Sequence, residues 1–189
     1  MNIINAKELE NIEGQLDFYN FDELSSLKKK QLMVKFNDEV RPVIYSDLQF
    51  DGNRKEYEDK EKILLLFLTN LFKKIDEISC IIKKYNEKWV VNNEISPELT
   101  NVLTEQLISN RFRGGICTVK DDLIIDLFIR SVFKYNSFVQ FIFKENQIII
   151  SPSDHLDIFI DSGDIDNLES KILEVFSVCG QDNLVLVKK

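Results

Sequence analysis

The chain of 189 residues has few of the side chains from which metal and redox sites are built. It contains one histidine and three cysteines, and no two cysteines form a CxxC pair. This spacing excludes a zinc knuckle and a CxxC redox motif. Cys80, Cys117 and Cys179 each lie in an apolar run, which predicts buried free thiols in a reducing compartment.

Glycine, proline and long apolar runs are also scarce. Six Gly and three Pro argue against a long flexible linker. The most apolar segment, 63–72, is only about half of the roughly 20 residues that a membrane-spanning helix needs. The first residues lack the basic stretch and apolar run of a secretory signal. We therefore expect a cytoplasmic protein without a membrane segment.

Phosphate-binding and nucleophile motifs are missing as well. Neither GxxxxGK[ST] nor GxGxxG occurs, and no elbow glycines surround a serine near the single histidine. The one basic cluster with an aromatic residue contains Arg111 and Arg113, which could hold an anion beside the amides of Gly114 and Gly115. The alternative interpretation, a helix that ends at the two glycines, is favoured. The sequence gives no strong enzyme motif.

The residues that are abundant indicate a packed core. Apolar residues make up 44% of the chain, charged residues 30%, and there are 14 Phe. This composition and length predict a single domain over residues 1–189. Residues 1–55 are the hardest to interpret. They form either an irregular N-terminal subdomain or an arm on the main sheet, with one or two edge strands.

Periodicity in the rest of the chain predicts alternating groups of strands and helices. Helical spacing of apolar residues covers 56–77, 96–110, 123–133 and 166–178. Two hairpins are expected, one over 78–91 and one over 137–151, followed by strands over 156–161 and 184–187. Because strands follow strands, we predict an α+β fold. Its sheet is antiparallel or mixed, with helices packed mainly on one side.

The last third of the chain is strongly acidic. Residues 151–189 hold eight Asp or Glu against three Lys, so they carry −5 of the net −8. An acidic surface favours a basic partner and opposes nucleic acid, whose binding rests on phosphate neutralisation. Phe159 is a candidate apolar anchor within that charge. The predicted partner-binding residues are Asp154, His155, Asp157, Phe159, Asp161, Asp164 and Asp166.

A metal site in this region is not predicted. His155, Asp157 and Asp161 would share one face of a strand, but the first and last would lie about 20 Å apart at roughly 3.3 Å per residue. Two remaining ligands are too few for a stable site. We therefore predict no metal and no cofactor.

In its class, the chain resembles bacterial immunity and inhibitor proteins, which are often small, acidic, motif-free α+β domains that cap a basic toxin. The resemblance implies a protein that neutralises a basic partner through its acidic surface. Two alternatives stay open. One is a ligand-binding or regulatory domain, including a homodimer joined through a sheet edge. The other is a hydrolase or nuclease without a familiar motif.

Overall fold

The computed structural model describes residues 2–16, 31–37, 54–84, 97–98, 101, 114–119, 122–135, 139–179 and 183–188. Its strands are β1 (Asn2–Asn5), β2 (Gln31–Phe36), β3 (Ser79–Lys84), β4 (Gly114–Val119), β5 (Val139–Phe143), β6 (Ile148–Pro152), β7 (Ile158–Ser162) and β8 (Leu184–Lys188). Its helices are α1 (Ala6–Glu13), α2 (Arg54–Lys74), α4 (Asp122–Tyr135) and α5 (Ile165–Cys179).

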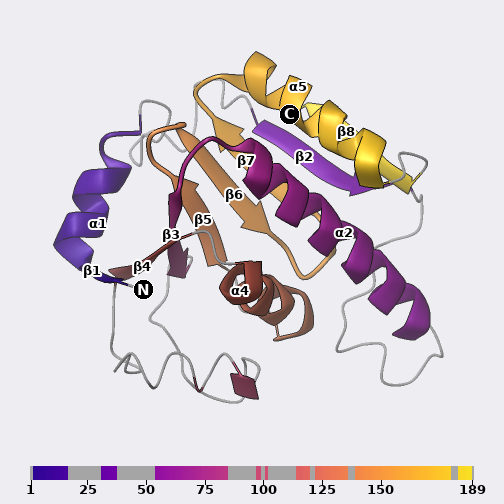
Figure 1. The fold of residues 1–189 in the computed structure, drawn as a ribbon, viewed down its shortest axis with the longest axis horizontal. Coiled ribbons are helices and arrows are strands. Elements are labelled where there is room, and N and C mark those ends of the chain that lie inside the picture. The colour runs from indigo at the N-terminus through magenta and orange to yellow at the C-terminus, as the bar shows by residue number, and fades with distance from the viewer. Residues whose placement is uncertain are drawn as a thin grey trace.

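The eight strands form one sheet in the order β1-β4-β3-β5-β6-β7-β2-β8, and every neighbouring pair is antiparallel. The prediction of an α+β fold with an antiparallel sheet is confirmed. The predicted hairpin over 137–151 is also confirmed as β5 and β6. Figure 1 shows the strands side by side, with β1 near one edge and β8 near the other.

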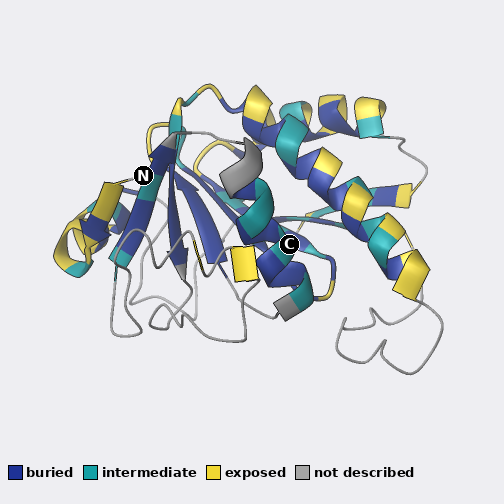
Figure 2. Cartoon of the chain, turned by 60° about the horizontal axis from the view of Figure 1, so that its bottom comes forward, coloured by how far each residue is buried: buried dark blue, intermediate teal, exposed yellow. Residues whose placement is uncertain are grey.

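Three helices cover one face of the sheet, as the sequence predicted. Helix α2 packs between α4 and α5, and all three bury apolar side chains against this face. Figure 1 shows them in front of the strands, and Figure 2 shows their exposed residues facing away from the buried sheet. The side chains that fill the layer are large. Phe67 contacts Phe176 with ring centroids 5.5 Å apart, and Phe72 contacts Phe141 at 5.2 Å. Such pairs stabilise the core beyond the area they bury.

Helix α1 packs on the opposite face of the sheet. Its Leu9 joins a smaller cluster with Ile81, Ile142 and Ile149, which alternate along their strands with residues of the main core. The helix contacts β1 and β4, and the cluster that it joins reaches across β3, β5 and β6. The half of this face formed by β7, β2 and β8 is not covered by any described helix.

Several local predictions need correction. The hairpin over 78–91 is wrong, because β4 and β5 occupy both edges of β3. Gly114 and Gly115 open strand β4, and the residues before them, where the helix was expected to end, lie outside the described part of the chain. The strand that precedes α5 begins at Ile158, later than predicted, and His155 lies in the turn before it.

The N-terminal part contributes to the same sheet at two distant places. Strand β1 pairs with β4 at one edge, whereas β2 lies between β7 and β8. The expectation of edge strands fits β1, but β2 has a neighbour on each side. Most of the helix expected over 96–110 lies outside the described residues. Within the described chain, no helix has the length and apolarity needed to cross a bilayer.

Candidate interaction face

The half of the sheet that α1 leaves open presents a row of apolar side chains. Phe159 on β7 is directly opposite Met33 on β2, and Met33 is directly opposite Val187 on β8. Side chains of directly opposite residues point to the same face and touch across strands. All three are half-exposed, as is Val185. We call Phe159, Met33, Val185 and Val187 the apolar stripe.

Polar and acidic residues border the apolar stripe. Asp161 follows Phe159 two positions along β7, so both side chains lie on this face. Its Oδ1 accepts a hydrogen bond of 3.0 Å from Nε2 of Gln31, the residue opposite it on β2. Asp157 immediately precedes β7, and both aspartates are half-exposed. The result is an apolar centre with carboxylates along β7.

The turn before β7 places Asp154 differently from the other predicted residues. Asp154 is only 4% exposed, and its Oδ1 accepts a 3.3 Å hydrogen bond from the hydroxyl of Ser153. The same hydroxyl oxygen accepts a hydrogen bond of 3.2 Å from the amide of His155. The carboxylate of Asp154 therefore lies inside the turn and is not presented at the surface, although His155 is exposed.

The arrangement of these three residues does not form a hydrolytic triad. Nε2 of His155 is 3.9 Å from Oδ1 of Asp154, and the hydroxyl of Ser153 bonds to the carboxylate without an intervening imidazole. In a triad, the histidine stands between the nucleophile and the acid. The hydrogen bonds instead close a tight turn in which Leu156 adopts a positive φ of 59°.

Two predicted acids lie at the start of α5. Asp164 is exposed, and its Oδ1 accepts a 3.2 Å hydrogen bond from the amide of Asn167. Asp164 is therefore the residue that caps this helix. Asp166 is also exposed and lies in the first helical turn, where a negative charge is favourable.

Other acids of α5 are neutralised by lysines. Oε2 of Glu169 is 2.6 Å from Nζ of Lys188 on β8, and this hydrogen bond raises the pKa of the lysine. Oε2 of Glu174 is 2.7 Å from Nζ of Lys74 on α2, and this contact lowers the pKa of Glu174. Glu169 and Glu174 therefore add little negative charge to this surface, whereas Asp164 and Asp166 at the start of α5 are exposed.

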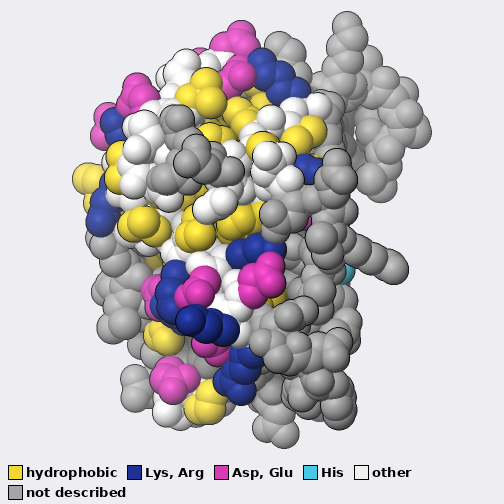
Figure 3. Space-filling view, turned by 90° about the vertical axis from the view of Figure 1, so that its right-hand side faces the viewer, with side chains coloured by type: hydrophobic (Ala, Val, Ile, Leu, Met, Phe, Trp, Pro, Cys, Tyr) yellow, Lys and Arg dark blue, Asp and Glu magenta, His cyan; other side chains and the backbone are white. Residues whose placement is uncertain are grey.

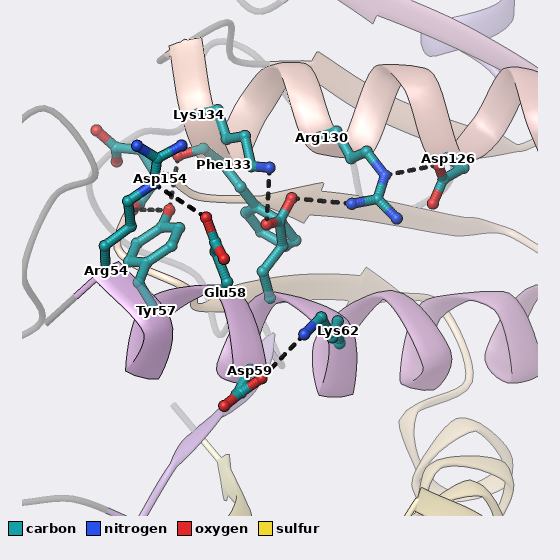
Figure 4. Close-up of polar contacts among 11 residues, drawn as sticks. Arg54, Tyr57, Glu58, Asp59, Lys62, Asp126, Arg130, Phe133, Lys134 and Asp154 are labelled. Atoms are coloured by element: carbon teal, nitrogen blue, oxygen red, sulfur yellow. Dashed lines mark hydrogen bonds and ion pairs between the residues drawn. The ribbon is translucent and has the colours of Figure 1, made fainter.

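A second polar cluster joins α2 to α4, as Figure 4 shows. The carboxylate of Glu61, whose side chain is 2% exposed, lies 3.4 Å from Nη1 of Arg130 and 3.2 Å from Nζ of Lys134. Arg130 also bonds to Asp126 at 2.7 Å, which raises the pKa of the guanidinium. Two cations around one buried carboxylate satisfy its charge, so this cluster holds the helices together.

Tyr57 ties the same helices to the turn before β7. Its hydroxyl donates to the carbonyl oxygen of Phe133 at 2.6 Å and lies 3.4 Å from that of Asp154. Figure 4 shows the hydroxyl pointing between these two residues. Through this contact the helical layer holds the turn in place and so positions the beginning of β7.

The side of the molecule on which α2 begins carries mixed charge. Arg54 pairs with Glu58, and Lys62 pairs with Asp59, at 3.0 Å and 2.9 Å. Figure 3 shows acidic and basic side chains next to one another on this side, beside hydrophobic ones. A surface of alternating sign has no net preference for a charged partner, so it is a weaker candidate than the open sheet face.

The sequence identified Phe159, Asp157 and Asp161 but missed Met33, Val185 and Val187. The first three lie close in sequence, whereas the last three are brought beside them only by the pairing of β2 and β8. The predicted anion-binding residues Arg111 and Arg113 lie outside the described residues. Among the described residues, no group of three His, Cys, Asp or Glu is placed to hold a metal ion.

Comparison of the chain with protein-family models, curated proteins and solved structures gives no match.

Proposed function

We propose that this protein is a binding protein of the immunity or inhibitor type that neutralises a basic protein partner in the cytoplasm. The apolar stripe, bordered by Asp157 and Asp161, is the contact surface. The observation that carries the proposal is the row of half-exposed Phe159, Met33 and Val187 on a sheet face that no described helix covers.

The composition of the apolar stripe supports this role. Aromatic residues and methionine are enriched in protein interfaces, where a few anchors at the centre contribute most of the binding energy. Met33 on β2 has the central position in the apolar stripe, with Phe159 beside it on β7. Its exposure on a regular strand also means that binding requires little reorganisation of the backbone.

The charge of the protein supports a basic partner. The net charge is −8, and residues 151–189 contribute −5 of it, although Lys188 and Lys74 pair with Glu169 and Glu174 in this segment. Carboxylates at the rim of an apolar contact speed association with a basic surface and select against acidic ones. Since such steering acts between exposed charges, binding should weaken as salt increases.

The test is affinity capture from lysate of the source cells, followed by measurement of the affinity for the captured protein. We expect Phe159→Ser to weaken binding at least tenfold and Asp157→Asn with Asp161→Asn to reduce its salt dependence. The asparagine at 161 retains an acceptor for Gln31, so the fold is preserved.

Matched control variants lie away from the face. Leu173→Ser removes an exposed apolar side chain from α5, and Glu145→Gln removes an exposed charge from the β5–β6 turn. Both should bind as the unaltered protein does. Unchanged affinity of Phe159→Ser, or an equal loss in Leu173→Ser, would contradict the proposal.

A further inference from the structure

The sheet ends at β8 with an edge that no described strand pairs. Strand β8 follows β2 at the end of the strand order and has no second neighbour among the described residues. The edge at the other end, β1, is four residues long and has an asparagine at each end. Strand β8 is five residues long with the sequence Leu-Val-Leu-Val-Lys. The two edges therefore differ in how well they are protected against pairing.

The hydrogen bonds to β2 determine which backbone groups of β8 face outward. The amide of Asn37 donates to the carbonyl oxygen of Asn183 at 3.0 Å, and these two residues continue the β2–β8 register. Hydrogen-bonded and non-hydrogen-bonded pairs alternate along an antiparallel ladder. Val185 and Val187 thus bond to β2, whereas the N–H and C=O groups of Leu184, Leu186 and Lys188 point away from the sheet.

Nothing in the side chains of β8 protects this edge. Natural edge strands are usually guarded by a charged side chain, a proline or a bulge. The only charged residue of β8 is Lys188, at its end, and its ammonium group is held by Glu169. Four consecutive aliphatic residues with outward backbone groups form a template for another strand.

We propose that β8 pairs antiparallel with β8 of a second copy of this chain, which joins two sheets across a two-fold axis at Leu186. In this register Leu186 is opposite Leu186 of the second copy, and Leu184 is opposite its Lys188. Each of the three outward N–H groups then meets an outward C=O group. The strand is therefore complementary to itself in both length and hydrogen-bonding phase.

Local charge favours a second copy as the occupant. Two chains of net charge −8 repel each other over most of their surface, but the β8 edge is apolar and its Lys188–Glu169 pair is neutral. Among the described residues of β8, none is acidic, so the strand offers a basic partner no carboxylate of its own. Pairing also places Val187 opposite Val185 of the second copy, so the apolar stripes of the two chains become continuous.

The test combines sedimentation with amide hydrogen exchange measured by NMR over a concentration series. We expect a monomer–dimer equilibrium in which the amides of Leu184, Leu186 and Lys188 exchange at least tenfold more slowly in the dimer. The amides of Val185 and Val187 should be protected at every concentration, because they bond to β2.

The variant Leu186→Pro tests whether the backbone of β8 forms the dimer. Proline removes one outward N–H and leaves the bonds of β2 intact, so the dimer should be lost while Val185 and Val187 remain protected. Leu173→Ser, the control, should dimerise normally. A protein that stays monomeric up to millimolar concentration overturns the proposal. So does a dimer in which the Leu184, Leu186 and Lys188 amides exchange as fast as in the monomer, since another surface would then form it.

Discussion

Gly115 lies on β4 where Leu9 of α1 and Ile81 of β3 approach the backbone closely. A Cβ atom placed on it would lie 2.8 Å from Cγ2 of Ile81 and 3.4 Å from Cδ1 of Leu9. The distance to Ile81 is shorter than two carbon atoms tolerate. The distance to Leu9, which belongs to α1, is also tight. The absence of a side chain at 115 therefore allows the helix to pack on this part of the sheet.

Replacement of Gly115 should consequently destabilise the protein. For Gly115→Val we expect a loss of about 1–3 kcal/mol in the free energy of unfolding, the usual cost of overpacking a core, measured by urea denaturation. Gly14→Ala is the matched control. Its Cβ would meet no atom closer than 3.4 Å and its φ is −65°, so stability should stay the same or rise by about 0.4–1 kcal/mol. Equal losses in both variants would contradict this explanation.

At the scale of elements, α1 depends on a buried ion pair as well as on apolar contacts. Lys83 on β3 and Glu13, the last residue of α1, form a salt bridge in which their side chains are 10% and 6% exposed. A buried pair of this kind is costly to form but still more costly to break, because removal of one partner leaves a charge without compensation. The pair therefore fixes where α1 lies on the sheet.

Substitution of Lys83 alone should lower the free energy of unfolding more than substitution of both Lys83 and Glu13. We expect Lys83→Met to lower the free energy of unfolding by about 3–5 kcal/mol, since it leaves the Glu13 carboxylate buried alone. The double variant Lys83→Met with Glu13→Leu should regain most of that loss. A double-mutant cycle by chemical denaturation measures the coupling. If the losses simply add, the two side chains do not act as a pair.

An element could be predicted from the sequence only where residues close together in the chain determine it. Periodicity identified α2, α4, α5 and the β5–β6 hairpin, because each is determined by residues near one another in sequence. The position of β2 could not be predicted, since Met33 meets Phe159 and Val187 only through long-range pairing. The same reason explains why three residues of the apolar stripe were missed. The burial of Asp154 depends on Ser153 and on the Tyr57 contact from α2, which no local pattern reveals.

At the scale of the whole molecule, β2 connects the beginning of the chain to its end. It lies between β7 and β8, so removal of its packing exposes two C-terminal strands at once. Leu32 lies at the centre of this arrangement, 1% exposed and part of the main core. Its Cα partners are Ile160 on one side and Lys188 on the other.

Truncation of Leu32 should therefore weaken the entire fold rather than an N-terminal arm. We expect Leu32→Ala to lower the free energy of unfolding by about 2–5 kcal/mol, as core truncations of leucine do. Amide hydrogen exchange should show that protection falls by the same amount in β8, beside the substitution, and in β3 near the opposite end of the sheet. This is because a cooperative domain opens as one unit. Loss of protection confined to β2, β7 and β8 would instead mean that the two halves of the sheet unfold separately. The prediction of a single domain would then be wrong.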